Sequence, residues 1–493
     1  MSKKGTTGRP GASTRPIRAL AILAGTTLLA LPLPLFAQSL EPVGQPSGGE
    51  AGTGPIPTSG LTVVAPVEDA AAEAVPLDDT MLRVGGLSSA APIEDNFGRL
   101  NLREASLDSL REKQWESRDE PQGVRLGTFL LRPAINQSIM WERNRTNGDN
   151  THRTYLQTSI GGTLTSDWSR HELTVIGNGE WQKNLRGEGE TEPEVDIGAD
   201  LRLDLAGETT AHVTGGYRFY REDTDDPNAI SGATTQSGVN QFSGGMSLER
   251  DFGRLRGTTS IALERDIYSD ATLSDGTKLS MKDRDQTSGE LRGRLGYEIS
   301  PALIPFIEAY VGRSIYDQDR DSQGYARSAR SYGGRGGVEV DLGEKLRGEL
   351  GLGYERVSYE DDRLDAIGAF TIDSAIYWSP RRGTDVTFGF ATTVNPLTTA
   401  DEAGYIDYTA TALLTHELRY NVVARLSGAS TWRRYPSGSS FDDETIYATA
   451  AGLSWGINRY LALTGDVGYE RTDRKNSADT QTLRAGIGLT LRR

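Results

Sequence analysis

The feature that most constrains the fold is the alternation of two kinds of connection along the chain. From about Gly127 to Arg493 the sequence reads as roughly eighteen segments in which apolar and polar residues alternate, as they do in β-strands with two different faces. Eight connections are tight turns and nine are longer and polar. Short turns at one end and long loops at the other are typical of an outer-membrane β-barrel. Seventeen connections predict an even number of strands, with both ends of the barrel on the short-turn, periplasmic side.

The tight turns are expected at residues 167–170, 205–208, 251–254, 300–302, 342–344, 379–383, 418–421 and 456–459. The clearest long loops are residues 221–228, 269–284 and 317–323. Because porins often fold one long loop into the lumen, the longest of these, residues 269–284, is the candidate for such a loop.

The alternation is clearest in residues 194–205, 290–299 and 345–355, where one face is apolar and the other is charged or glycine. A soluble β-sandwich also alternates, but its apolar face packs against a second sheet. This chain has only 11 Phe and 5 Met for such a core, while its apolar face continues from strand to strand. The predicted fold class is therefore all-β: a transmembrane antiparallel β-barrel of about eighteen strands, preceded by a mostly disordered periplasmic segment.

Composition excludes several other classes. The chain is 36% hydrophobic with a mean hydropathy of −0.47, and past its N-terminus it lacks the apolar runs of about 20 residues that an inner-membrane helix requires. The absence of cysteine excludes disulfides, thiol nucleophiles, thiolate metal sites and a lipoprotein anchor. A TonB-dependent receptor is disfavoured because such receptors need a folded plug and about twenty-two strands, and the segment before Gly127 is too short for that plug.

Three domains are expected from these patterns. Residues 1–37 form a signal peptide, with a basic start and an apolar stretch that ends near Ala37. Residues 38–120 are a disordered, low-complexity periplasmic segment with one short helix, and residues 121–493 are the outer-membrane barrel. Loss of residues 1–37, with five basic and no acidic residues, takes the formal charge from −15 to −20. Such acidity argues against nucleic acid as a partner.

Charged residues on the polar strand faces are the candidates for lining the lumen, because a basic residue facing lipid costs about 2–4 kcal/mol at the midplane. In one interpretation, arginine ladders beside an acidic stretch order small polar solutes in a pore. In the other, the charges pair across strands and only satisfy a wet interior. The pore-lining candidates are Asp196, Asp200, Arg202, Arg254, Arg256, Glu290, Arg292, Arg294, Glu298, Arg347 and Glu349.

The inventory of reactive groups gives no sign of an enzyme. There are only four histidines, none with a nearby Ser and Asp or Glu on the same strand face, and no G-x-S-x-G elbow. The alternating carboxylates of residues 317–321 resemble a calcium loop but lack its glycine and its final glutamate. We expect no enzymatic activity, no metal site and no cofactor, and we interpret the acidic loops as solvated tips.

The opening strand carries a family resemblance. Gly127-Thr-Phe-Leu-Leu-Arg-Pro133, followed by Ile135 and Trp141-Glu-Arg-Asn144, resembles the first strand of the putative β-barrel porin 2 family. The resemblance extends over about residues 123–493. It implies an outer-membrane barrel of a Gram-negative bacterium, often linked to surface or exopolysaccharide production, with no catalytic residues to transfer. The last strand departs from the usual assembly signal because it ends in Arg493 instead of an aromatic residue.

The expected function is a passive pore for small polar solutes or an outer-membrane component associated with surface polysaccharide production. The alternative is a sealed structural or adhesin-like barrel that binds partners through its acidic loops. The expected partners are outer-membrane lipid and lipopolysaccharide, the barrel assembly machinery, and polysaccharide or small solutes.

Overall fold

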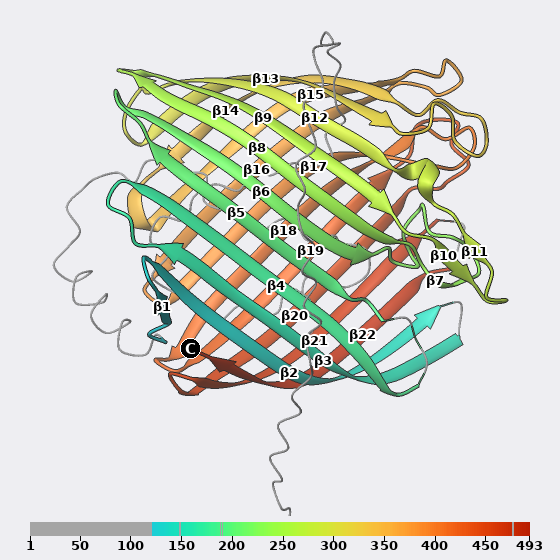
Figure 1. Cartoon of the computed structure of the whole chain (residues 1–493), viewed down its shortest axis with the longest axis horizontal. Helices are drawn as coiled ribbons and strands as arrows, with labels where there is room; N and C mark the ends of the chain where they lie inside the picture. The colour runs from blue at the N-terminus through green and yellow to red at the C-terminus, as the bar shows by residue number, and fades with distance from the viewer. Residues whose placement is uncertain (1–120, 147–148, 188, 190, 476–477) are drawn as a thin grey trace, which may run out of the picture. The chain divides into compact units, whose positions relative to one another are not determined.

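The first and last long strands of the sheet are hydrogen-bonded to each other, which closes it into a barrel (Figure 1). The computed structural model describes residues 121–146, 149–187, 189, 191–475 and 478–493. Eighteen antiparallel strands make up the wall, as the sequence predicted. The expected signal peptide and the periplasmic segment of residues 38–120 lie outside the described residues. In the part of the chain that is described, no helix has the length and apolar character needed to cross a bilayer.

The strands of the wall, in chain order, are β2 (Phe129–Thr146), β3 (Asp149–Ser166), β4 (His171–Arg186), β5 (Glu194–Asp204), β6 (Thr209–Arg221), β8 (Gly238–Phe252), β9 (Leu255–Tyr268), β12 (Gln286–Tyr297), β13 (Leu303–Tyr316), β14 (Ala329–Asp341), β15 (Leu346–Tyr359), β16 (Ile367–Arg381), β17 (Thr384–Pro396), β18 (Gly404–Arg419), β19 (Val422–Arg434), β20 (Glu444–Asn458), β21 (Leu461–Arg474) and β22 (Thr480–Arg492).

The remaining elements are short. They are β1 (Val124–Leu126), β7 (Ala233–Thr235), β10 (Ala271–Leu273), β11 (Lys278–Leu279) and the 3-10 helices η2 (Lys282–Arg284) and η3 (Gly343–Lys345). β1 pairs with the start of β2 at the short-turn end. β7, β10 and β11 form a separate three-stranded sheet at the long-loop end. That sheet joins the two longest connections, β6 to β8 and β9 to β12.

The connections alternate as predicted, with eight tight turns at one end of the wall and the longer loops at the other. One of the tightest turns uses a left-handed backbone: Gly253, between β8 and β9, has φ +74°, a conformation that favours glycine. One outer connection is also short, since β2 ends at Thr146 and β3 begins at Asp149. The described chain begins and ends at the short-turn end, where the backbone of Arg493 donates to the Pro133 carbonyl.

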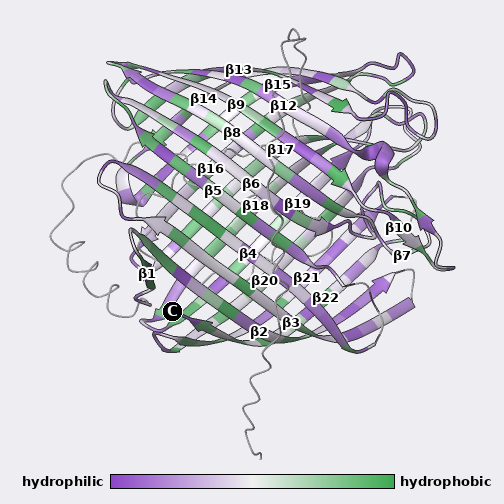
Figure 2. Ribbon diagram, in the orientation of Figure 1, coloured by the Kyte–Doolittle hydropathy of each residue, from purple (hydrophilic) through white to green (hydrophobic). Residues whose placement is uncertain are grey.

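Side chains alternate between the two faces of the wall. On β21, Val467 and Tyr469 are exposed on the outside, whereas the intervening Gly468 and the flanking Glu470 belong to the inner face. Figure 2 shows hydrophobic residues recurring along the strands and hydrophilic residues concentrated in the outer loops. In solution such a surface of exposed Leu, Ile, Val and aromatic side chains would be costly, but it suits a wall surrounded by lipid.

Candidate functional site: the lumen and its mouth

The inner wall from β12 to β16 carries a connected network of ion pairs. Glu308 on β13 is 2% exposed on its side chain and accepts a hydrogen bond from Arg292 Nη1 at 2.7 Å. Arg335 on β14 donates to the same carboxylate through Nε at 2.8 Å. Adjacent strands hold these side chains side by side, because Arg292 is paired in register with Tyr310 and Glu308 with Arg335. The sequence placed Arg292 on the inner face but did not identify Glu308 as its partner.

This network extends to four further predicted residues. Glu290 accepts from Arg292 Nε at 2.8 Å, and Arg294 lies 2.8 Å from Glu349. Arg256 Nη1 on β9 lies 3.3 Å from Glu339 Oε1, and Arg294 Nη2 lies 3.5 Å from the other oxygen of the same carboxylate. Arg256, Arg292 and Arg294 are thus matched by carboxylates of the inner wall, as expected for a polar interior whose charges pair across strands.

The other predicted residues lie in different surroundings. Asp200 on β5 is buried against His212 Nδ1 at 3.2 Å, and Arg202 pairs with Asp204 at 3.1 Å. Asp196, farther along β5, is exposed. Arg347 lies over the Tyr377 ring at 5.0 Å.

Two predicted residues lie outside the strands. Arg254 is exposed in the turn between β8 and β9, and Glu298 follows the end of β12 in the next turn. Both therefore sit at the short-turn end and not along the inner wall. Whether any of the eleven candidates contacts a permeating solute stays a prediction.

A second cluster lies where the barrel closes. Glu142 on β2 faces Arg484 on β22 and Arg153 on β3, its direct partners in the two strand registers. Arg484 Nε donates to Glu142 at 2.7 Å and Arg153 Nε donates at 2.8 Å. Glu192, in the connection before β5, lies 3.8 Å from both arginines. One carboxylate thus joins the first two strands to the last.

The connection from β6 to β8 forms the most unusual feature of the mouth, and we call residues 222–237 the mouth strap. At its base Glu222 pairs with Arg284 of η2, and one of the two contacts, from Nη1, is 2.9 Å. Gln236 closes the returning part by accepting from the Ile230 amide and donating to the Ile230 carbonyl. β7, within the strap, pairs with β10. The base of the strap is therefore held on its own side of the barrel.

The tip of the mouth strap is bound to a distant part of the rim. Asn228 Nδ2 donates to the Pro396 carbonyl at 3.2 Å. Its Oδ1 accepts from the Thr398 amide at 2.9 Å and from the Thr398 hydroxyl at 3.1 Å. Asp225 lies 3.8 Å from Arg474 at the outer end of β21. The strap therefore has contacts on both the β17–β18 and the β21 sides of the mouth.

These contacts require the strap to cross the mouth. Between β8 and β17 the wall contains β9, β12, β13, β14, β15 and β16. In the other direction around the ring, the strands between β6 and β18 are β5, β4, β3, β2, β22, β21, β20 and β19. Since adjacent strands lie about 4.8 Å apart, the two connections are on nearly opposite sides of the ring.

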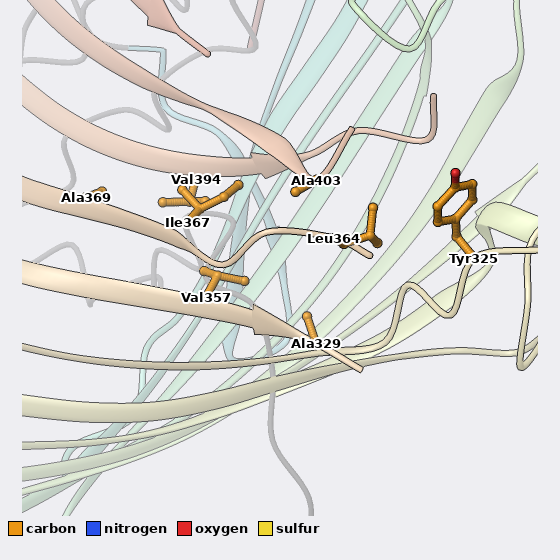
Figure 3. Packing of buried hydrophobic residues seen from close by; sticks show 8 residues of the cluster. All are labelled: Tyr325, Ala329, Val357, Leu364, Ile367, Ala369, Val394 and Ala403. Atoms are coloured by element: carbon orange, nitrogen blue, oxygen red, sulfur yellow. The ribbon is translucent and has the colours of Figure 1, made fainter. Parts of the chain in front are cut away.

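The receiving loop, residues 397–403, is itself firmly held. Arg327 is 2% exposed, pairs with Asp321, and donates to the carbonyls of Leu397, Thr399 and Glu402. An apolar cluster of loop and strand-end residues packs at this end (Figure 3), and its members are Tyr325, Ala329, Val357, Leu364, Ile367, Ala369, Val394 and Ala403. The tip of the strap therefore binds a loop that is itself held in place by hydrogen bonds and packing.

The strap also brings acidic groups together at the mouth. Burial and the neighbouring Asp223 raise the pKa of Asp225, while Arg474 acts in the opposite direction. Burial likewise raises the pKa of Glu222, despite its pairing with Arg284. Among the described residues no group of three or more His, Asp or Glu side chains has the spacing of a metal site.

The connection that crosses the mouth is a different one from the candidate that the sequence offered. Residues 269–284 were the candidate, but it is the shorter polar stretch after β6 that reaches the opposite rim. Residues 274–279 of the longer loop are exposed, and its inner end supplies Arg284 to hold the strap base. The Asp-Asp-Pro-Asn sequence at 225–228 resembles an ordinary turn, so the sequence held no signal for this contact.

Comparison with known proteins supports a porin-like outer-membrane barrel. The family model described as putative beta-barrel porin 2 matches residues 119–493. No curated protein matches the chain.

Among solved structures, OccAB4 of Acinetobacter baumannii has 10% identity and a TM-score of 0.38, covering 74% of this chain and 98% of that chain. OccK11 of Pseudomonas aeruginosa has 14% identity and a TM-score of 0.37, covering 76% and 99%. These scores are too low to support an inference about this chain. The family match covers all eighteen strands of the wall, and the chain therefore belongs to the putative β-barrel porin 2 family.

Proposed function

We propose that this protein is a passive, non-catalytic channel for small polar solutes in the outer membrane of a Gram-negative bacterium. The observation that carries the proposal is the mouth strap, which crosses a polar lumen and reaches the opposite rim through Asn228. A barrel of sixteen to eighteen strands encloses an aqueous lumen unless something fills it. A single strap narrows such a lumen and selects solutes by size and charge.

The charge arrangement of the wall is consistent with this proposal. The carboxylates of β13 to β15 hold the arginines against the wall, as Glu308 does for Arg292 and Arg335. Because these ion pairs lie along the wall, the centre of the lumen is left to water. A permeating solute meets the fixed dipoles of the ion pairs and no single dominant charge. The polar inner wall therefore favours a size-limited pore for polar solutes over a binding pocket for an apolar ligand.

A sealed structural barrel is the competing function. It is favoured by the interlocked outer loops, in which Ser440 of one connection donates to Glu402 of another at 2.7 Å. The link to surface polysaccharide production stays a prediction from the family resemblance.

Single-channel recording separates the pore from the sealed barrel. The purified barrel, once shown to be heat-modifiable on a gel, is expected to give stable stepwise conductance in a planar bilayer, because ion pairs line its inner wall. A planar bilayer that receives the same detergent without the protein is the control for leakage. A folded barrel that inserts but carries no current would contradict the proposed function and favour the structural role.

A further inference from the structure

One buried carboxylate at the mouth has no partner of its own. Glu470 lies on the inner face of β21 and is 2% exposed. Its Oε2 atom is buried and has no hydrogen-bond partner among the described residues. Burying an ionised carboxylate without a hydrogen bond or a counter-charge is costly, so such a group calls for a proton or a cation from outside.

The surroundings of Glu470 add negative charge. Asp223 and Asp225 of the mouth strap, and Glu192 before β5, all interact with it electrostatically. Arg484 interacts with Glu470 in the opposite sense, but Arg484 is already hydrogen-bonded to Glu142 at 2.7 Å and lies 3.8 Å from Glu192. The strap therefore brings two carboxylates toward a wall that already holds an unpaired one.

Counting the charges at this point shows the excess. The carboxylates Glu142, Glu192, Asp223, Asp225 and Glu470 face the three arginines Arg153, Arg474 and Arg484. Arg474 also donates through Nε to Glu444 at 2.9 Å, and Glu444 is in turn paired with Arg433 at 2.7 Å, so this neighbouring pair adds no net charge. The five carboxylates, which we call the strap carboxylate cluster, exceed the arginines by two when all are ionised.

We propose that the strap carboxylate cluster is a binding station for a small organic cation with an ammonium or guanidinium head group. This inference rests on the proposed function, which opens the cluster to solutes from the lumen. The described carboxylates do not meet at the spacing of a metal site, whereas a guanidinium presents five N–H donors and reaches acceptors that lie farther apart.

The partly exposed Asp223 and Asp225 form the outer contact of this station. A small movement of the strap then lets the head group donate to Glu470 Oε2. Binding supplies the missing donor to a buried acceptor and neutralises part of the excess charge. An uncharged solute of similar size has neither effect, so the station discriminates by charge.

The test uses agmatine as the probe, because it carries both a guanidinium and an ammonium group. Isothermal titration calorimetry of the folded full-length barrel in detergent is expected to detect agmatine binding. Glu470→Gln, which keeps the side-chain shape, should weaken that binding by at least about tenfold, or about 1.4 kcal/mol. Asp225→Asn is the second variant and should weaken it as well. Glu344→Gln, in the exposed turn before β15, makes the same charge change at the opposite end and should leave binding unchanged.

The outcomes distinguish the station from the channel. Equal agmatine affinity in the wild type and in E470Q, or no binding to the wild type, would overturn the binding station and leave the channel intact. Binding that depends on Glu470 in a barrel without conductance would support the station and contradict the proposed function. In a conducting barrel, agmatine should also interrupt the current, and glucose at the same concentration should not.

Discussion

Replacing residues 223–236 by Asn-Gly is expected to raise the single-channel conductance severalfold. Arg221 and Gly238 are paired in register on β6 and β8, and the Glu222 amide donates to the Ser237 carbonyl. A two-residue hairpin turn can therefore join Glu222 to Ser237 without changing the wall. The variant keeps Glu222 as the partner of Arg284 and removes the part that crosses the mouth together with β7 and Gln236. Conductance in planar bilayers measures the effect.

Two comparisons make this result specific to the strap. Replacing residues 274–277, an exposed hairpin tip in the other long loop, by the same Asn-Gly should leave the conductance unchanged. Asn228→Ala, which removes the three hydrogen bonds to Pro396 and Thr398, should give an intermediate and noisier current. Unchanged conductance in the strap deletion would show that the strap is not the narrowest point of the pore.

Glu142→Gln is expected to lower the free energy of unfolding by about 3 kcal/mol, at the low end of the range for breaking a buried ion pair. Arg153 and Arg484 would lose their close carboxylate, and Glu192 lies farther from both, at 3.8 Å. The low end applies because water in the lumen can solvate part of the lost contact. Urea unfolding of the barrel in lipid vesicles, followed by tryptophan fluorescence, measures the change.

The matched control is an ion pair of the same chemistry at the surface. Asp443 lies 3.0 Å from Arg434, and both side chains are nearly half exposed. Because exposed pairs contribute about 0–1 kcal/mol, Asp443→Asn should change the unfolding free energy by less than about 1 kcal/mol. Equal effects in the two variants would show that Glu142 does not hold the closure of the barrel.

Much of the wall follows from local sequence. A strand in lipid requires apolar residues at every second position, and this requirement alone predicted the alternation of residues 194–205, 290–299 and 345–355. The same parity put Glu290, Arg292 and Arg294 on one inner face. It could not choose their partners, because the pairing of Arg292 with Glu308 depends on the register between β12 and β13.

The mouth could not be read from the sequence in this way. The bond between Asn228 and Thr398 joins residues 170 positions apart, and neither residue belongs to a periodic pattern. Asn and Asp are common wherever a polar turn meets water. Loop length was also a poor guide, since residues 269–284 were the candidate for an inward loop by length alone, and they supply Arg284 to the base of the strap. Contacts between loops depend on where the closed wall brings their ends.

Disulfide trapping of the strap tip tests the central claim most directly. The chain has no cysteine, so Asn228→Cys with Thr398→Cys introduces a single pair. Their side chains now meet through a 3.1 Å hydrogen bond, and a disulfide needs Cβ atoms about 3.5–4.5 Å apart. The account predicts that mild oxidation gives a faster-migrating, reducible band on a denaturing gel, and that the control pair Asp149→Cys with Thr398→Cys does not. A strap pair that stays reduced in the folded barrel would contradict a strap that crosses the mouth.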